Sequence, residues 1–381
     1  MKFLHLSDLH IGKSVNGFSM LDEQRHAFRQ MIKCIRAERP DAVIIAGDVY
    51  DRAVPGIEAV RLFDDFLTAL AREKVAVMLI SGNHDSPERI NYASRLLSEK
   101  RLFFYSVFDG AIHKITLPDE YGEVNFWLLP FIKPSALRGV FREPEIESYD
   151  DAIAAALAAA DIDFSARNVL VSHQFYTKAG ITPLRSESEL NPVGGLDAVE
   201  AGLIEHFDYA ALGHLHGGQN VGAAHLRYCG SPIKYSFSEW RQEKSITIVE
   251  LGEKGKLAIR ALPLTPLHDM REIKGGLERL ISDEISSLAD QEDYLRVILT
   301  DEEEIIDPMG KLRSVYPNIM SLGFENSRTN IDIGAITADA EIIGKLSPYD
   351  LFGEFFLEIQ GSAMSEEQAE IVRELLDTMD N

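Results

Sequence analysis

Five short stretches of the sequence concentrate aspartate, asparagine and histidine at spacings that suit metal binding. Imidazole, carboxylate and amide oxygen are donors for first-row divalent ions such as Mn²⁺, Fe²⁺ and Zn²⁺. In an extended backbone the two side chains of an i,i+2 pair point the same way, so each Asp-x-His or His-x-His pair presents two donors together. The stretches are Asp8-Leu9-His10, Gly47-Asp48-Val49-Tyr50-Asp51, Gly82-Asn83-His84-Asp85, His173 and Gly213-His214-Leu215-His216.

The number of donors favours two ions over one. Seven ligands are too many for a single ion and suit two ions if one carboxylate bridges them. Two ions about 3.5–4 Å apart can hold an attacking hydroxide and a phosphate oxygen together. The set therefore predicts hydrolysis of a phosphoester. For Gly-Asn-His-Asp alone, a simple turn is the alternative. The histidines outside the set lack a partner pattern and are interpreted as structural: His5, His26, His113, His206, His225 and His268.

Each polar stretch follows an apolar segment of strand-like composition. In an α/β sheet the carboxyl ends of the strands face one crevice, where ligands bind. We therefore expect the polar residues to meet at one place, with Gly82 allowing the chain to turn sharply off its strand. The apolar segments are Leu4–Ser7, Val43–Ala46, Val77–Ile80, Val169–Ser172 and Ala210–Leu212.

The order of elements predicts an α/β fold with two packed sheets and helices outside. Strands and helices alternate over the first hundred residues, which implies a largely parallel sheet. The expected strands there are Phe3–Leu6, Ala42–Ala46 and Val75–Ile80, and the expected helices are Gln24–Arg36, Ile57–Leu70 and Ser86–Ser98. Later strands are expected at 103–107, 112–117, 125–129, 169–172, 209–212, 225–229 and 245–250, and a helix at 151–160.

The pattern of expected strands and helices changes near Pro266, and the sequence predicts four parts. Residues 1–265 form the catalytic domain, and 266–326 form a small α+β capping domain built from helix 277–288, strand 294–299, helix 309–316 and strand 319–324. A linker covers 327–346. Residues 347–381 form C-terminal helices, expected at 348–360 and 365–379.

Composition limits the classes of protein. The 381 residues are 45% hydrophobic, so the chain can bury a core, and the net charge of −23 argues against a simple basic nucleic-acid binder. Most of the acidity lies after Thr265, where 26 acidic residues face 9 basic ones. Two cysteines, no signal-like amino terminus and no apolar run of about 18 residues predict a cytoplasmic protein.

The pattern DxH, GDxxD, GNHD, H and GHxH resembles the calcineurin-like metallophosphoesterase superfamily, whose fold is a two-sheet sandwich flanked by helices. Within it the sequence resembles the SbcD family of nuclease subunits from bacterial double-strand-break repair. The resemblance covers nearly the whole chain. Its motifs are HLSDLHIGK, IAGDVYDRAVP, SGNHDSPER, SHQF, GHLHGGQ and YCGSPIKYSFSE, the last at Tyr228–Glu239.

This resemblance implies roles for the polar residues. His84 would face the substrate and either stabilise the transition state or protonate the leaving oxygen, with Asp85 orienting it. Mn²⁺ is the implied metal, with Mg²⁺, Fe²⁺ and Zn²⁺ as alternatives. The implied ligands are Asp8, His10, Asp48 and His216 for one ion, and the bridging Asp48 with Asn83, His173 and His214 for the other.

The implied activity is a Mn²⁺-dependent DNA nuclease, with double-strand 3′→5′ exonuclease and single-strand or hairpin endonuclease action, serving DNA end processing, repair and recombination. Arg52 and Lys13 are candidate contacts to substrate, although each could instead pair with an acid or stay solvated. One alternative is a two-metal phosphodiesterase or phosphatase for a small molecule or phosphoprotein. The other is a scaffold with little chemistry, which a broken metal motif would indicate.

The resemblance also implies DNA ends and hairpins, an SbcC-type ATPase and a homodimer as partners. The ATPase would dock on the apolar cluster Leu351, Phe352, Phe355 and Phe356, for which packing on the capping domain is the alternative. The dimer would use helices after GDVYD and GNHD. Its candidate residues, which could equally face the core of one copy, are Val60, Leu62, Phe63, Phe66 and Leu67.

Overall fold

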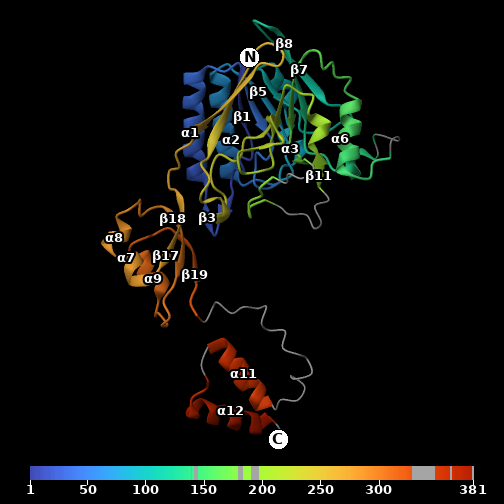
Figure 1. Ribbon diagram of the computed structural model, residues 1–381. Coiled ribbons are helices and arrows are strands. Elements are labelled where there is room, and N and C mark those ends of the chain that lie inside the picture. The colour runs from blue at the N-terminus through green and yellow to red at the C-terminus, as the bar shows by residue number, and fades with distance from the viewer. Residues whose placement is uncertain are drawn as a thin grey trace. The chain divides into compact units, whose positions relative to one another are not determined.

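The computed structural model describes residues 1–138, 140, 145–178, 183–189, 197–327, 348–360 and 363–379. These residues form two compact units, Met1–Asp269 and Met270–Asn381, which are described separately (Figure 1). Apart from Ser327, the predicted linker lies outside the described residues. The predicted division of the second unit after residue 326 stays a prediction. Across the described ranges, every helix is too short or too polar to cross a membrane.

Two six-stranded sheets form the body of the first unit, within the described residues. In order, the first sheet contains β16 (Leu257–Pro263), β15 (Ser245–Leu251), β1 (Lys2–Leu6), β4 (Ala42–Ala46), β5 (Ala76–Ile80) and β6 (Leu102–Phe104). The second contains β13 (Gln219–Val221), β14 (Ala223–Tyr228), β12 (Tyr209–Leu212), β9 (Arg167–Ser172), β8 (Gly122–Leu129) and β7 (His113–Asp119). Strands β1, β4, β5 and β6 are parallel, as are β8, β9, β12 and β14.

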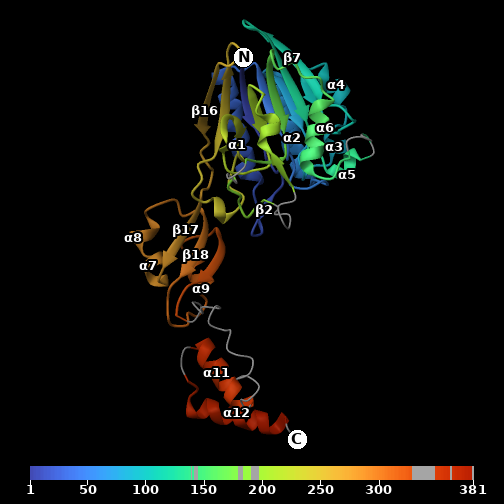
Figure 2. The same ribbon diagram turned by 45° about the vertical axis from the view of Figure 1, so that its right-hand side comes forward.

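The two sheets pack face to face, with helices on their outer faces (Figures 1 and 2). Side chains alternate between the two faces of a strand, so a strand buried on both sides is apolar throughout. In β4, Val43 and Ile45 pack toward the helices, whereas Ile44 packs between the sheets. The same layer between the sheets receives Phe126 and Val169 from the second sheet. This arrangement confirms the predicted two-sheet sandwich.

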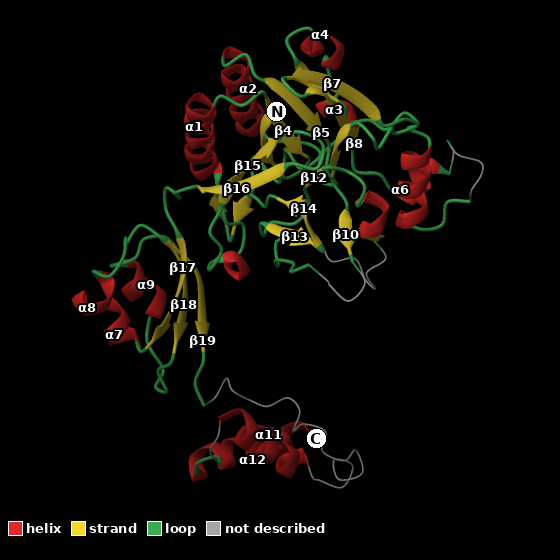
Figure 3. Cartoon of the chain, turned by 45° about the horizontal axis from the view of Figure 1, so that its top comes forward, coloured by secondary structure: helices red, strands yellow, loops and turns green. Residues whose placement is uncertain are grey.

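Helices α1 (Leu21–Glu38) and α2 (Ile57–Arg72) cover the first sheet, and α6 (Tyr149–Ala158) covers the second (Figure 3). The rings of Phe28 and Phe66 stack between α1 and α2 with their centroids 4.4 Å apart. Of the five candidate dimer residues, Leu62, Phe63 and Phe66 are buried in the core and Leu67 packs against it, while Val60 is exposed.

The structure differs from the sequence prediction where short-range geometry interrupts a pattern. Instead of one helix at 86–98, α3 (Pro87–Ile90) and α4 (Ser94–Ser98) are separated at Ala93, whose φ of 59° is left-handed. Edge strand β16 was missed because its residues are half-buried or exposed, as an edge permits, and so lack the apolar pattern of a core strand. Other short elements of this unit are β2 (Ser14–Val15), β3 (Phe18–Ser19), β10 (Phe175–Thr177), β11 (Ala198–Glu200) and α5 (Pro134–Leu137).

The second unit contains a small parallel sheet and two C-terminal helices. The sheet order is β17 (Met270–Gly275), β18 (Tyr294–Leu299) and β19 (Ile319–Phe324). Its helices are α7 (Leu277–Ile281), α8 (Asp283–Ser286) and α9 (Pro308–Arg313), and its core includes Leu295, Val297, Leu299 and Leu312. The predicted helix 277–288 is broken because Ser282 is extended, and β17 was not predicted. Helices α11 (Pro348–Gln360) and α12 (Glu366–Met379) follow.

Candidate metal centre

Five strands from both sheets deliver the seven predicted ligands to one place. Strands β1, β4 and β5 are neighbours in the first sheet, and β9 and β12 are neighbours in the second. Each is followed within four residues by at least one predicted ligand. The parallel direction of neighbouring strands brings their carboxyl ends to the same edge, as expected for an α/β site. Six of the seven residues are buried: Asp8, His10, Asp48, His173, His214 and His216.

One half of the cluster consists of Asp8, His10 and His216, and we call it the His216 side. The Nε2 atoms of His10 and His216 lie 3.0 Å apart. Ligand atoms of these three residues all lie within 4.8 Å of one another. Two imidazole nitrogens and a carboxylate that face one another in a buried space are a donor set for a divalent cation.

The other half consists of Asn83, His173 and His214, and we call it the His173 side. The amide oxygen of Asn83 lies 3.1 Å from Nε2 of His173 and 3.0 Å from Nδ1 of His214. The second ring nitrogen of His173, Nδ1, lies 2.7 Å from the carbonyl oxygen of Ala46 and donates to it. That hydrogen bond fixes the ring so that its Nε2 faces the cluster.

Asp48 lies between the two sides. Its Oδ2 is 3.6 Å from Nε2 of His10 and 3.3 Å from Nε2 of His173. The backbone amide of His84 donates to its Oδ1 at 2.8 Å. On the His216 side, the amide of His214 donates to both carboxylate oxygens of Asp8 at 3.0 and 3.1 Å. The residues present therefore fit two divalent ions, with Asp48 placed to reach both.

The backbone at the centre is held in conformations that most side chains avoid. Asp8, His10, Asp48 and His214 have φ values of 52°, 41°, 50° and 104°. Left-handed backbone at a non-glycine residue costs free energy and persists where the surrounding structure enforces it, commonly at functional sites. The amides of Asp8 and His10 donate to carbonyl oxygens of Gly47 and Asp48 at 3.1 and 3.0 Å, which enforces it here.

Glycines at the centre allow close approach of the chain. A Cβ at Gly82 would collide with the side chain and backbone of Asp48, and one at Gly47 would collide with the ring of His173. Gly82 does not have a left-handed φ. It is required because it lacks a Cβ rather than because of the sharp turn that the sequence suggested.

The buried titratable groups of the cluster shift one another's pKa values. Burial opposes protonation of His173, but the carboxylates of Asp48 and Asp8 and the hydrogen bond to Ala46 together outweigh it and raise the pKa of His173 to about 9. Burial lowers the pKa of His10 well below its ordinary value and that of His214 to about 3. Burial also disfavours the charged form of Asp48, but His173 and neighbouring histidines hold the pKa of Asp48 well below its usual range. This carboxylate is therefore ready to receive a cation.

His84 lies at the rim of the cluster and is half-buried. Its Nδ1 lies 3.0 Å from the carbonyl oxygen of Asp51. Asp85 instead accepts backbone N–H bonds from Val49, Tyr50 and Gly82 at 3.1, 2.9 and 3.0 Å. The carboxylate of Asp85 thus holds the loops together, and the Asp51 carbonyl performs the orienting role that the sequence gave to Asp85.

Lys13 and Arg52, the two candidate contacts to substrate, differ in how far their side chains are exposed to solvent. The ammonium of Lys13 pairs with Asp51 at 2.8 Å, and its side chain is only 16% exposed. The Arg52 side chain is 82% exposed, with Nε 3.6 Å from the carboxylate of Asp51. Both residues therefore adjoin the loop that orients His84, and Arg52 is the one that solvent reaches freely.

The candidate partner residues lie in the second unit. Leu351, Phe352 and Phe355 of α11 are exposed, and Phe356 is half-buried. The ring of Phe352 lies 6.3 Å from that of Phe355 and 6.5 Å from that of Phe356, between centroids. The predicted apolar cluster therefore exists on α11 with a large part of its surface open.

The sequence analysis did not identify a group of polar and charged side chains that supports His216. It contains Ser188, Glu189, Glu239 and Lys244, all within hydrogen-bonding reach of His216. Burial disfavours the charge of Glu239, but Lys244 and His216 together outweigh it and hold the pKa of Glu239 well below its usual range. The signal available in the sequence was the stretch Tyr228–Glu239, which belonged to the resemblance without an assigned role.

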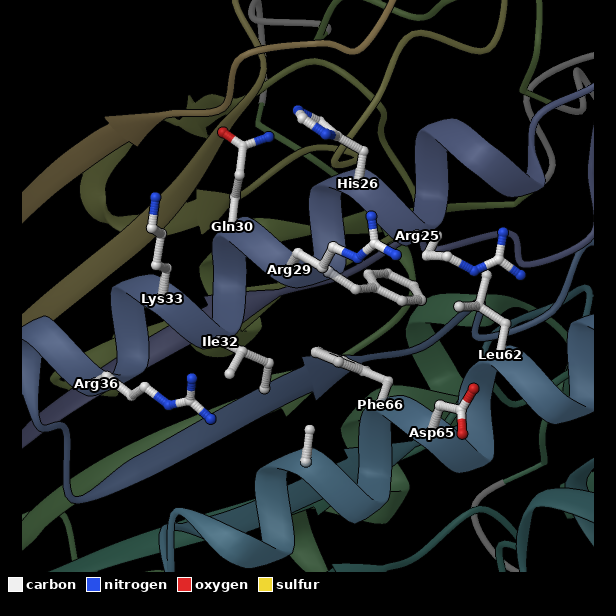
Figure 4. A pocket seen from close by; sticks show the side chains of 12 residues that line it. Arg25, His26, Arg29, Gln30, Ile32, Lys33, Arg36, Leu62, Asp65 and Phe66 are labelled. Carbon is white, nitrogen blue, oxygen red and sulfur yellow. The ribbon is translucent and has the colours of Figure 1, made fainter.

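A pocket of about 630 Å³ lies elsewhere, between α1 and α2 (Figure 4). Its floor is apolar, with Phe28, Ile32 and Phe66, and cationic side chains of α1 line one side of it. None of its lining residues is a predicted ligand, and a hollow alone does not identify the chemistry of this protein.

The chain matches two family models. Residues 1–218 match the calcineurin-like phosphoesterase family. Residues 266–360 match a family described as the type 5 capsule protein repressor C-terminal domain. The first match covers the whole candidate metal centre from Asp8 to His216.

Curated relatives extend the similarity to nearly the full length. The SbcD subunit of the nuclease SbcCD from Staphylococcus epidermidis is 31% identical over 379 residues, 99% of this chain and 98% of the relative. The protein of the same name from Staphylococcus saprophyticus is 30% identical over 380 residues, with the same shares covered. The chain belongs to the calcineurin-like phosphoesterase family and, within it, to the family of SbcD nuclease subunits. It is accordingly a phosphoesterase enzyme whose family uses divalent metal ions.

Two solved structures also align with the chain. A dimetal phosphatase from Danio rerio is 12% identical and covers 68% of this chain and 95% of its own, with a TM-score of 0.40. A phosphopantetheinyl hydrolase from Mycobacterium tuberculosis is 17% identical and covers 63% of this chain and 92% of its own, with a TM-score of 0.36.

Proposed function

We propose that this protein is the Mn²⁺-dependent nuclease component of a DNA end-processing complex. Its activities are double-strand 3′→5′ exonuclease and single-strand or hairpin endonuclease cleavage, in repair and recombination. The observation that carries the proposal is the convergence of seven donors and His84 at one edge of two sheets, in a chain related to SbcD nuclease subunits along 99% of its length.

The donor set supports a pair of divalent ions. Asp8, His10, Asp48 and His216 would hold one, and Asp48, Asn83, His173 and His214 the other. Mixed oxygen and imidazole donors without thiolate suit Mn²⁺, and Mg²⁺, Fe²⁺ and Zn²⁺ are alternatives. Such ions supply positive charge next to the phosphate and activate water for attack.

His84 has the geometry of a group that serves the leaving oxygen. Its Nδ1 donates to the Asp51 carbonyl, which can only accept, so Nε2 is the nitrogen left for the substrate. A proton on Nε2 can pass to the oxygen that leaves phosphorus, which is general-acid catalysis. Arg52 and Lys13, beside the same loop, are proposed contacts to the phosphate backbone.

The proposed partners are DNA ends and hairpins, an SbcC-type ATPase and a second copy of the chain. The exposed cluster on α11 is a helix-borne apolar face of the kind that docks into a partner's groove. The exposed Val60 leaves part of α2 open to a partner helix.

The test is cleavage of end-labelled linear duplex and hairpin DNA with Mn²⁺, beside a generic phosphodiester. The Asn83→Ala, His84→Ala double variant is compared with the unaltered protein. DNA cleavage that disappears in the variant supports a nuclease that uses this site. Hydrolysis of the generic ester alone, even after an SbcC-type ATPase is added, contradicts DNA as the substrate and leaves the metal chemistry standing.

A further inference from the structure

A buried acid–base pair stands directly behind His216. Glu239 closes the short 3₁₀ turn Phe237–Glu239, and Lys244 precedes β15. Their side chains are 0% and 7% exposed, and Nζ of Lys244 lies 2.6 Å from Oε2 of Glu239. Removing two charges from water costs several kcal/mol per ion, so a buried pair is weak evidence for stability and invites a search for another role.

The carboxylate of Glu239 is aimed at the ring of His216. Its Oε1 lies 3.2 Å from Nδ1 of His216. The hydroxyl of Ser188 lies 2.8 Å from the same Nδ1 and 2.6 Å from the same Oε1. The ring can therefore donate to Glu239 directly or through Ser188, and both routes end at one oxygen.

These contacts select one form of the imidazole. A carboxylate can only accept a hydrogen bond, so the ring proton belongs on Nδ1 and the lone pair on Nε2. Nε2 is the atom that lies 3.0 Å from Nε2 of His10, inside the metal cluster. Carboxylate partners of this kind orient metal-binding histidines in other sites.

The same groups hold the backbone of His216. Lys244 donates to the His216 carbonyl oxygen at 2.9 Å and to Ser231 at 2.9 Å. The carboxylate of Glu189 accepts a hydrogen bond from the backbone amide of His216 at 2.7 Å. Lys244 thus ties together the Glu239 carboxylate and the main chain of the residue whose ring that carboxylate faces.

We propose that Glu239, held in place by Lys244, is a positioning residue that sets the ring orientation and tautomer of His216 for metal binding. The inference rests on the proposed metal centre and assigns to the Tyr228–Glu239 stretch a role in building it. Glu239 acts through His216 and does not touch the ions or the substrate.

Glu239→Gln is the informative variant because it keeps the size of the side chain. The Lys244 ammonium attracts the amide oxygen, which turns the NH₂ group toward His216 and moves the ring proton to Nε2. We expect the affinity for one of two Mn²⁺ ions to fall about 10–100-fold while the other ion binds as before.

Two readouts are needed. Calorimetric titration with MnCl₂ gives the affinity and number of ions, and long-range ¹H–¹⁵N spectra of the metal-free protein report the His216 tautomer. Asp119→Asn is the matched control, because Asp119 and Arg167 form another poorly exposed acid–base pair, at the opposite ends of the strands. Thermal unfolding of both variants shows how much stability each has lost.

A Glu239→Gln protein with the original tautomer and affinity would overturn the proposal. So would a loss of affinity no larger than Asp119→Asn causes at equal loss of stability. If the unaltered protein binds no Mn²⁺, the proposed function fails, yet the tautomer in metal-free spectra still decides the role of Glu239. If Glu239→Gln does not fold, the same comparison is made with the Glu239→Asp, Ser188→Ala double variant, which keeps the buried charge but withdraws both the direct and the relayed contact from the ring. An unchanged tautomer and affinity there also overturn the proposal.

Discussion

The two sides of the metal centre are built in different ways. On the His173 side, the supporting partner of the ring is a main-chain carbonyl, that of Ala46 at the end of β4. On the His216 side, the supporting partners are charged side chains: Glu239, which ends the motif Tyr228–Glu239, and Lys244, which follows it. One side is therefore supported by the sheets themselves, and the other by a layer that a single substitution can remove.

This difference shows where the centre tolerates change. A backbone carbonyl survives any substitution at its own residue, provided that the strand keeps its place. A carboxylate held by an ammonium depends on both side chains, and loss of one leaves the other charge buried without a partner. The His216 side should therefore be the more sensitive to substitutions outside the metal ligands.

Asp48→Ala tests whether the two sides share one residue, and its effect should be the largest. The carboxylate lies between His10 and His173, so its loss removes a donor from both ions. We expect Mn²⁺ binding to weaken at both sites and cleavage to become undetectable. Titration and DNA cleavage measure this, with Asp64→Ala, an exposed acid of α2, as control. Retention of one tight ion would mean that Asp48 serves one side alone.

His84→Ala separates chemistry from metal binding. His84 belongs to neither side, so both ions should still bind with their original affinity. Cleavage should slow by about 10²–10⁴-fold, the usual contribution of a positioned general acid or base. Single-turnover cleavage and Mn²⁺ titration are compared with those of His113→Ala, a half-buried histidine of β7. Unchanged cleavage would remove His84 from the mechanism.

Protons compete with metal ions for His173, so metal affinity on the His173 side should depend on pH. The pKa of His173 is about 9 in the folded protein against 6.5 ordinarily, so the metal-free protein gains up to about 3 kcal/mol from this group. That gain is complete below pH 6.5 and disappears as pH rises through 9. The proton must leave before an ion binds, so affinity on the His173 side should rise up to about tenfold per pH unit toward pH 9.

Chemical unfolding of the metal-free protein between pH 6 and 10 measures the first effect. Calorimetry in buffers of different ionisation enthalpy counts the protons that Mn²⁺ displaces. Stability that rises through pH 9 would have the wrong sign and contradict the assigned Asp48–His173 interaction.

Gly82→Ala should have the smallest effect of the four. The added methyl group collides with Asp48, and overpacking of this kind costs about 1–3 kcal/mol. Because Asp48 would move, both ions should bind more weakly. Gly56→Ala is the control, since no atom of the described residues lies within 4 Å of a Cβ there and the φ of Gly56 is −68°. Equal stability of the two variants would contradict the close approach of Gly82 and Asp48.

The sequence predicted the sandwich and the place of the centre because both follow from local signals. Apolar strands that end in Asp, Asn or His mark the crevice, and parallel order brings their ends together. Contacts between distant residues left no such signal. The support of His216 by Lys244 and the left-handed φ of Asp8 and His10 arise only when separate segments meet.

The sequence pattern also gave a wrong prediction where the backbone conformation of a single residue ends a helix. The left-handed Ala93 splits a helix whose apolar pattern continues through it. Sequence adjacency suggested that Asp85 contacts His84, whereas its carboxylate accepts hydrogen bonds from the amides of Val49, Tyr50 and Gly82.

The position of β1 has a consequence for how the protein is made. This strand precedes every other strand of the sheet in the sequence, and in the sheet it lies between β4 and β15. Strand β15 ends at Leu251, so β1 keeps an open edge until residues 245–251 have left the ribosome. Pairings of such long sequence separation form slowly. A nascent chain that ends before β15 therefore contains every predicted metal ligand, up to His216, while the strand that leads to Asp8 and His10 still lacks one of its two neighbours.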